Sequence, residues 1–172
     1  MSVLRPSIPD LFRQAKSAGL STSLDTNDDP QDKWEPDVLD VLQYVDVFLP
    51  NEAEARKITR TEDLSSAIDQ LAAVAKVVVV KRGSAPAICR SGQQQWSLSP
   101  PSVNPVDHVG AGDTFGAGFL HKYLQAAKLE DCLAYANIAG AYSTTKEGGT
   151  EAFLDRAALT SFIQQHCYED HG

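Results

Sequence analysis

The stretch VDHVGAGDTFGAGFL, residues 106–120, decides how this chain is interpreted. Gly110, Ala111 and Gly112 have little or no side chain, so their backbone N–H groups can converge on one point. A helix rich in small residues is predicted to follow, from about Gly112 to Ala126. A helix N-terminus has N–H donors without intrahelical partners and a partial positive charge, so it binds anions, phosphate above all. The segment therefore predicts an anion cradle at the start of a helix.

An acidic residue, Asp113, falls in the first turn of that predicted helix. A carboxylate beside an anion cradle is unfavourable if the cradle only binds anions, because like charges repel. Its presence is explained if Asp113 accepts the proton of a hydroxyl that attacks a held phosphoryl group. The alternative is that Asp113 is an ordinary first-turn residue and that residues 110–112 form a simple tight turn. The residues by themselves leave both interpretations open.

Two other phosphate-binding motifs are compared with the same glycines. Gly110, Gly112 and Gly116 form GxGxxxG, a loose relative of the dinucleotide fingerprint, which follows a hydrophobic strand. Here a proline-rich loop precedes the glycines, and the acidic residues at the right distance, Glu130 and Asp131, open a predicted helix. The sequence contains no GxxxxGK[ST], which excludes a P-loop. The nicotinamide interpretation is therefore disfavoured.

Outward from this segment, short apolar runs alternate with amphipathic stretches. Strands are expected at residues 20–24, 44–49 and 77–80, a hairpin at 85–98, and helices at 9–18, 62–75, 129–145 and 155–166. The continuous run VVVV at 77–80 indicates a strand buried on both faces, which is typical of a parallel sheet. The segment TNDDPQDKW is expected to be a loop. Alternation of helices with strands predicts an α/β fold.

Composition limits the class of protein. The chain has 172 residues, 42% of them apolar, and a formal net charge of −8, which predicts a single domain over residues 1–172. No Lys/Arg run offers an electrostatic footprint for nucleic acid, so no such partner is expected. No apolar run approaches the roughly 20 residues that span a bilayer, and the N-terminus lacks the apolar core of a secretory signal. Three cysteines without a CxxC predict reduced thiols and a cytoplasmic location.

The quoted segment also resembles a known signature. VDHVGAGDTFGAGF resembles DTxGAGDxF, the second signature of the ribokinase-like (PfkB) carbohydrate kinases. In chain order, LDTNDDPQDKW resembles the D-x-N segment of that family, FLPNEAEA its N-x-x-E motif, and VVVVKRGSAPA its strand-and-glycine segment. YANIAGAYSTTKEGGTEAF resembles its C-terminal helix and glycine-rich turn. The resemblance extends from about residue 8 to residue 166, with one departure: His108 stands where the family usually has Thr.

The resemblance implies roles in phosphoryl transfer from ATP to a sugar hydroxyl. Asp113 matches the catalytic base, and the N–H groups of Gly110, Ala111 and Gly112 match the anion hole for the transferred phosphoryl group. Asn51 and Glu54 match the motif that organises Mg²⁺ and phosphate, with few direct ligands because Mg²⁺ keeps several waters. Without the family, Asn51 is interpreted as an ordinary helix N-cap, and the alternative for Glu54 is a solvated helix residue.

Further matches concern the nucleotide and a monovalent cation. The resemblance places Lys81 and Gly83 at the nucleotide and Asn137 in the lining of the adenine pocket. Asp107 and the Val109 carbonyl match the K⁺ loop of potassium-activated members, completed by the turn in KEGGT. From the residues alone, Lys81 simply ends a strand, and Asn137 in an apolar helix needs either a buried partner or a ligand.

The family resemblance also shows what has no counterpart in this chain. The N-terminal part of the family, with its first glycine-rich signature, sugar-contacting residues and β-lid, is not matched. The expected fold is therefore a three-layer ribokinase-like parallel sheet flanked by helices, truncated at the N-terminus and lacking the β-lid. The expected function is a sugar kinase using ATP and Mg²⁺. The alternatives are a nucleotide-binding fragment without turnover, or half of a split kinase that needs a partner chain, with a homo-oligomer also open. The sugar is not determined.

Overall fold

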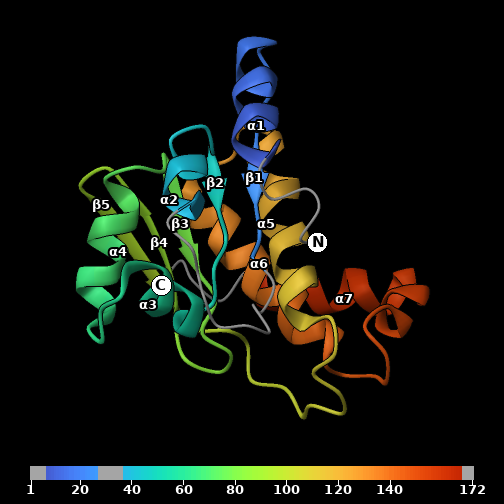
Figure 1. Ribbon diagram of the computed structural model, residues 1–172. Coiled ribbons are helices and arrows are strands. Elements are labelled where there is room, and N and C mark those ends of the chain that lie inside the picture. Colours follow the sequence, from blue (N-terminus) through green and yellow to red (C-terminus); the bar gives the residue numbers. More distant parts are fainter. Residues whose placement is uncertain (1–6, 27–36, 168–172) are drawn as a thin grey trace. The chain divides into compact units, whose positions relative to one another are not determined.

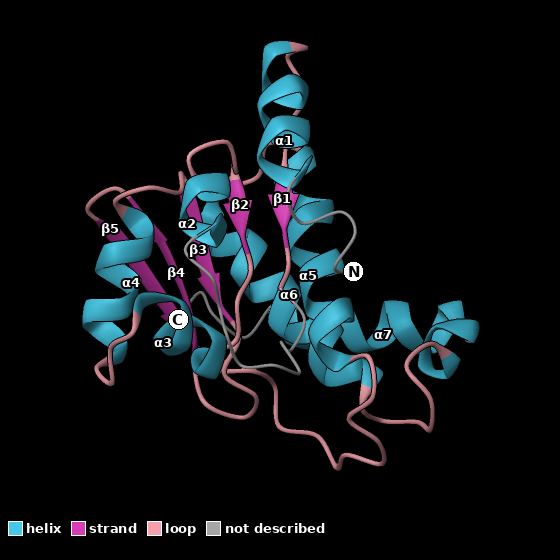
Figure 2. Ribbon diagram, in the orientation of Figure 1, coloured by secondary structure: helices cyan, strands magenta, loops and turns pink. Residues whose placement is uncertain are grey.

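The computed structural model describes residues 7–26 and 37–167 (Figure 1). These residues divide into two compact units. Among the described residues, the first unit comprises those up to Lys81 together with Cys89–Gln95, and the second comprises Arg82–Ile88 and those from Trp96 onward. Helices and strands alternate along the first unit, whereas the second is mainly helical (Figure 2). The protein is a mixed α/β protein, as predicted.

One five-stranded sheet has the strand order β1-β2-β3-β4-β5. β1 (Ser23–Leu24), β2 (Val47–Phe48) and β3 (Val77–Val80) are parallel neighbours, with Ser23 opposite Val47 and Val47 opposite Val77. All four valines of β3 are buried, so both faces of this strand are covered. The parallel pairing inferred from the VVVV run is therefore confirmed for these three strands. β1 and β2 are shorter than the apolar runs that predicted them.

The predicted hairpin is also present. β4 (Ala87–Ser91) and β5 (Gln94–Leu98) are neighbours in the sheet and are joined by two residues. A connection this short joins antiparallel strands only. Gly92 lies in this turn with φ of +55°, a conformation that glycine adopts without a steric penalty.

Four helices belong to the first unit: α1 (Ile8–Ser17), α2 (Asp37–Leu42), α3 (Glu52–Thr59) and α4 (Leu64–Ala72). α4 packs against β3 through a buried apolar face of Ala67, Ile68 and Leu71, within the predicted helix at 62–75. α2 was not predicted, although its Val41 and Leu42 are buried in the core. The predicted loop at TNDDPQDKW lies, after its first residue, outside the described residues.

The second unit contains α5 (Ala111–Leu124), α6 (Leu129–Ser143), the 3₁₀ helix η2 (Glu151–Leu154) and α7 (Arg156–Cys167). α5 and α6 pack closely because small residues face each other. A Cβ built on Gly118 would lie 2.9 Å from the Ala139 Cβ, and one on Gly140 would lie 3.3 Å from the Phe115 Cβ. This close packing holds the N-terminus of α5 on a rigid helical pair. The three predicted helices of this unit are observed, with ends shifted by one or two residues.

Candidate functional site

The predicted anion cradle is the N-terminus of α5. Gly110 is the N-cap residue, with φ of +74°, and Ala111, Gly112 and Asp113 form the first turn. Within the described part of the chain, no side-chain hydrogen bond caps this end of the helix. The Ala111 N–H donates to the His108 carbonyl at 3.3 Å, a long contact that an incoming anion can replace. Asp113 is exposed in this first turn, so its carboxylate is accessible to a hydroxyl group from solvent.

A close approach of two glycines fixes the cradle. A Cβ on Gly110 would lie 2.9 Å from the Gly149 Cα, and a Cβ on Gly149 would lie 3.1 Å from the Val109 carbonyl oxygen. Real Cβ atoms essentially never approach backbone as closely as 2.9 Å, so Gly110 requires glycine in this conformation, whereas a Cβ on Gly149 would force the Val109 carbonyl to shift by a few tenths of an ångström. The loop before α5 and the KEGGT turn are therefore packed backbone against backbone.

Asp107 ties the same two loops together. Its carboxylate accepts hydrogen bonds from the Val109 N–H at 3.0 Å and from the Gly148 N–H at 2.9 Å. Those two backbone donors hold the pKa of Asp107 below its usual value. The Asp107 N–H donates in turn to the Thr144 carbonyl at 3.2 Å. The structure thus brings Asp107, Val109 and the glycine turn together, and a cation at this loop stays a prediction.

The two remaining predicted residues of the second unit differ in their surroundings. Asn137 is buried, with 5% of its surface exposed, and its Nδ2 donates to the Leu98 carbonyl at 2.9 Å. The sequence left open a buried partner or a ligand, and the structure supplies the partner. Gly83 lies in a turn with φ of +59° and open space where a Cβ would be. Conformation, not crowding, therefore explains the glycine at this position.

In the first unit, Asn51 and Glu54 form a complete capping box at the N-terminus of α3. The Glu54 N–H donates to Asn51 Oδ1 at 2.9 Å, and the Asn51 N–H donates to Glu54 Oε2 at 2.8 Å. The N-cap interpretation of Asn51 is therefore confirmed. Glu54 is buried, with 5% exposed, so it is not the solvated helix residue of the alternative interpretation.

Lys81 follows β3 and is bound to the β2–α3 junction through its backbone. Its N–H donates to the Pro50 carbonyl at 2.9 Å, and its carbonyl accepts from the Glu52 N–H at 3.1 Å. Its ammonium group donates to both carboxylate oxygens of Asp25, at 2.6 and 2.8 Å. The sequence predicted no partner for Lys81. For its partner Asp25, the signal in the sequence was the resemblance of LDTNDDPQDKW to the D-x-N segment.

A magnesium ion would find few direct protein ligands. Among the described residues, no group of three or more His, Cys, Asp or Glu side chains is placed to hold a metal. This is compatible with Mg²⁺, which keeps several waters and binds through one or two carboxylates plus substrate phosphates. Glu54 fits such a role, because its two described hydrogen bonds both use Oε2.

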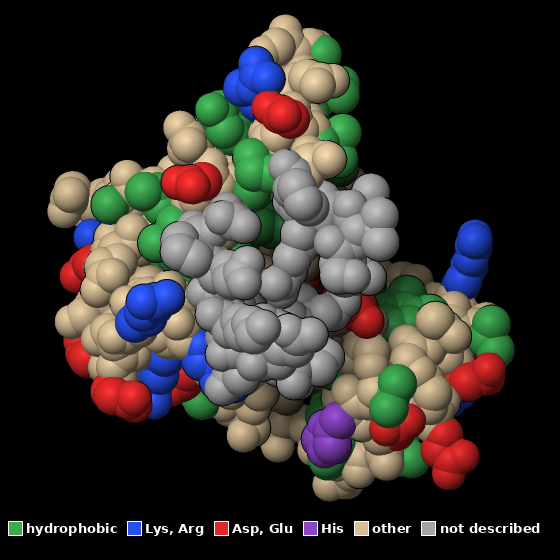
Figure 3. Space-filling view, viewed as in Figure 1, with side chains coloured by type: hydrophobic (Ala, Val, Ile, Leu, Met, Phe, Trp, Pro, Cys, Tyr) green, Lys and Arg blue, Asp and Glu red, His purple; other side chains and the backbone are tan. Residues whose placement is uncertain are grey.

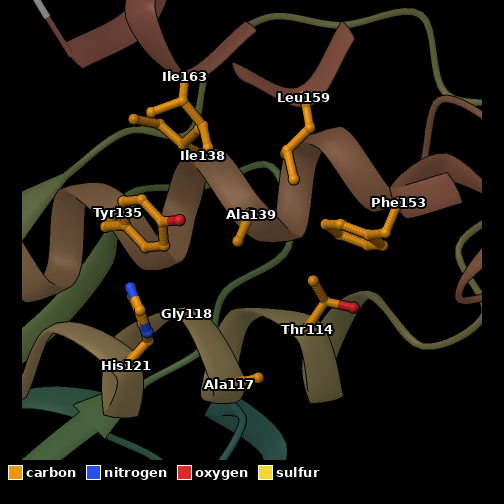
Figure 4. Close-up of a pocket in the computed structure, with 10 residues that line it drawn as sticks. All are labelled: Thr114, Ala117, Gly118, His121, Tyr135, Ile138, Ala139, Phe153, Leu159 and Ile163. Carbon is orange, nitrogen blue, oxygen red and sulfur yellow. The ribbon is translucent and has the colours of Figure 1, made fainter. Parts of the chain in front are cut away.

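A separate pocket of about 210 Å³ lies in the second unit (Figure 4). Residues of α5, α6, η2 and α7 line it: Thr114, Ala117, Gly118, His121, Tyr135, Ile138, Ala139, Phe153, Leu159 and Ile163. His121 points toward Tyr135, and their ring centroids are 5.6 Å apart. None of the predicted site residues lines this largely apolar pocket, so it is distinct from the cradle at Gly110.

The surface carries both signs of charge. On the face shown in Figure 3, acidic and basic side chains are interspersed among the described residues. No helix in the described part of the chain is long and apolar enough to cross a membrane. The net charge of the chain is −8, so the overall field repels an anionic ligand. Local geometry would have to hold such a ligand.

Comparison with known proteins identifies the family. The model of the pfkB family of carbohydrate kinases matches residues 3–156, and the chain belongs to that family. It is 31% identical to the ATP-dependent ribose-1-phosphate kinase of Halopiger xanaduensis over 83% of this chain and 46% of that protein. The chain spans about half the length of the curated relatives it matches.

Solved structures resemble the fold. The ribokinase of Arabidopsis thaliana, complexed with ribose and ATP, has a TM-score of 0.80 and 26% identity, covering 93% of this chain and 53% of that chain. A double mutant of the fructokinase from Vibrio cholerae, with fructose, ADP and potassium ion bound, has a TM-score of 0.78 and 27% identity. That match covers 91% of this chain and 58% of the fructokinase.

Proposed function

We propose that this chain carries the nucleotide-binding portion of a sugar kinase, which transfers the γ-phosphoryl group of ATP to a sugar hydroxyl. The observation that carries the proposal is the start of α5. A left-handed glycine, Gly110, leads into an uncapped first turn that contains an exposed carboxylate, Asp113. That combination serves a reaction in which a hydroxyl is deprotonated beside a held phosphoryl group.

In this proposal, Asp113 accepts the proton of the acceptor hydroxyl as its oxygen attacks the γ-phosphorus. The bond from phosphorus to the bridging oxygen of ADP breaks in the same step. The N–H groups of Gly110, Ala111 and Gly112 donate to the oxygens of the transferred group and stabilise their charge. Because the cradle is fixed before ATP arrives, little reorganisation is required during the reaction.

The other site residues act on the nucleotide and on cations. Asn51 and Glu54 orient the hydration shell of Mg²⁺, which neutralises phosphate charge when bound. Lys81 and Gly83 contact the nucleotide, and Asn137 lines the adenine pocket. K⁺ is proposed at the loop of Asp107 and the Val109 carbonyl, supported by the convergence of that loop with the glycine turn. The names of relatives keep ribose and fructose open as acceptors, with 2-keto-3-deoxygluconate also open.

The place of this chain within the family fold is also part of the proposal. We infer that the chain corresponds to the C-terminal portion of a three-layer ribokinase-like fold, without the β-lid, and forms one domain. A cytoplasmic location, typical of this family, is part of the proposal.

A second candidate function is nucleotide binding without turnover, either by this chain alone or as half of a kinase completed by a partner chain or a second copy. Its support is that the chain spans about half the length of its relatives. The two candidates differ in one measurement. Sugar-dependent release of ADP by the chain supports the kinase, whereas MgATP binding without such release supports the second candidate.

The experiment that tests the role of Asp113 compares two aspartates in equivalent positions. Asp113→Asn is expected to abolish sugar-dependent ADP release while MgATP binding, measured by titration calorimetry, persists. Asp131→Asn is the matched control, because Asp131 is an exposed first-turn residue of α6 and loses the same charge. Equal activity of Asp113→Asn and wild type would refute the assignment of the base. A wild-type chain that binds MgATP without any turnover supports the second candidate function instead.

A further inference from the structure

Two consecutive residues after β1 contact two of the predicted nucleotide-site side chains of the first unit, Lys81 and Glu54. Asp25 pairs with Lys81, from which it is separated by 56 positions in the sequence. Thr26 Oγ1 donates to Glu54 Oε2 at 2.9 Å across 28 positions. Lys81 directly follows β3, and Glu54 lies in the first turn of α3, which follows β2. Both contacts therefore lie at the carboxyl ends of the parallel strands, where α/β proteins bind ligands.

The Asp25 contact fixes a flexible cation. The ammonium group of Lys81 has three donors, and two of them are directed to the Asp25 carboxylate. The Lys81 side chain is 15% exposed and its backbone is bound on both sides, so few other positions are open to it. A lysine held in this way loses less conformational freedom when a phosphate binds to its remaining donor.

The Thr26 contact fixes a carboxylate. Glu54 Oε2 already accepts from the Asn51 N–H, and Thr26 adds a second donor to the same oxygen. Two donors on one oxygen set the plane of the carboxylate and leave Oε1 as its acceptor toward a hydrated cation. No hydrogen bond to Glu54 Oε1 is found in the described part of the chain. Oε1 is also not one of the fully buried side-chain atoms that lack a hydrogen-bond partner.

We propose that Asp25 and Thr26 are positioning residues for polyphosphate binding: Thr26 orients Glu54 toward the waters of Mg²⁺, and Asp25 holds Lys81 for a phosphate oxygen. The proposal rests on the proposed function, because it assigns partners to two residues of that same site. Neither Asp25 nor Thr26 touches the nucleotide in this account.

The test measures MgATP and Mg²⁺-free ATP binding to the full chain by titration calorimetry. Thr26→Val keeps the shape of the side chain and removes the hydroxyl. Loss of a hydrogen bond to a charged group is expected to weaken MgATP binding about tenfold. The weak binding that remains without Mg²⁺ is expected to be the same for this variant and wild type, because Glu54 then has no hydrated cation to orient. Thr26→Ser, which retains the hydroxyl, is expected to restore most of the affinity.

For Asp25→Asn, the direction of the change in ATP affinity distinguishes the two interpretations. If Asp25 were a bystander, Asp25→Asn would tighten ATP binding, since it removes a negative charge near a polyanion. The positioning role instead predicts about threefold to tenfold weaker binding, because Lys81 loses its fixed position. Asp69→Asn is the matched control, since Asp69 is an exposed partner of Arg90 and loses the same charge.

Each outcome separates the two proposals. Absence of MgATP binding by the folded wild-type chain would refute the proposed function and this inference with it. Wild-type binding together with equal MgATP affinity of Thr26→Val would overturn the inference and leave the proposed function standing. Thermal unfolding of every variant, monitored by circular dichroism, shows whether a loss of binding reflects a loss of folding. Thr160→Val, on the exposed face of α7, controls for the threonine exchange itself.

Discussion

Replacing Gly110 by alanine tests whether backbone packing builds the cradle at α5. Two separate effects oppose a side chain at this position. The residue has φ of +74°, and a Cβ there would lie 2.9 Å from the Gly149 Cα. The first effect is conformational and belongs to the residue, whereas the second is steric and belongs to the contact between two loops. A pair of matched variants separates them.

The expected magnitude follows from these two effects. A left-handed conformation costs a residue with a Cβ about 1–2 kcal/mol. Overpacking of a contact that cannot yield costs about 1–3 kcal/mol more. Gly110→Ala is therefore expected to lower the free energy of unfolding by about 2–5 kcal/mol, or to displace the loop and weaken MgATP binding at least about tenfold.

Gly19→Ala is the control for conformation alone. Gly19 has φ of +75°, and nothing lies within 4 Å of its Cβ position, so only the conformational cost of about 1–2 kcal/mol applies. Gly149→Ala approaches the same contact from the other side, without a left-handed conformation, and isolates the steric effect. Urea unfolding and MgATP titration measure all three. If Gly110→Ala costs no more than Gly19→Ala and binds MgATP as wild type does, the contact between the loops does not build the cradle.

Three further predictions concern other parts of the chain. Burial opposes ionisation of Asp46, but hydrogen bonds from Lys16 and Thr22 outweigh it and hold the pKa of Asp46 below its usual value. The ionised carboxylate therefore stabilises the fold fully above the unfolded-state pKa, and this stabilisation is lost as pH falls through the lower folded-state pKa. In urea unfolding between neutral pH and about pH 3, Asp46→Asn should lose less of its free energy of unfolding than wild type does. Gly118→Ala should destabilise by about 1–3 kcal/mol through its contact with Ala139, and Ala139→Gly in the double mutant should recover part of that loss; a strictly additive pair would contradict the packing described. Asp107→Ala should accelerate hydrogen exchange at the Val109 and Gly148 amides relative to wild type, as measured by NMR, because both donate to that carboxylate; unchanged exchange would show that the loops are held by other contacts.

Local patterns predicted the elements whose cause is local. The bounds of β3 match the VVVV run, because a strand covered on both faces is apolar at every position. The uncapped helix at Gly110 follows from the adjacent small residues, whose spacing is visible in the sequence. α2 was missed because its six residues are short for a periodicity argument and its burial depends on tertiary packing.

Partners distant in the sequence could not be predicted in the same way. Nothing in the sequence near Lys81 indicates that its ammonium group pairs with Asp25, because only the parallel sheet brings the two strand ends together. Asn137 was left with two interpretations because its acceptor, the Leu98 carbonyl, lies 39 positions away. The spacing of Asn51 and Glu54 in the sequence is that of a capping box. The sequence did not show that Glu54 is buried, which is the property that makes it a candidate ligand.

The most direct test of the account is titration of the purified, folded wild-type chain with MgATP and, separately, with ATP in the presence of a magnesium chelator. The account predicts micromolar to millimolar binding of MgATP that is largely lost when Mg²⁺ is removed. A chain that unfolds cooperatively and yet binds neither form of ATP would contradict the claim that these residues form a nucleotide site.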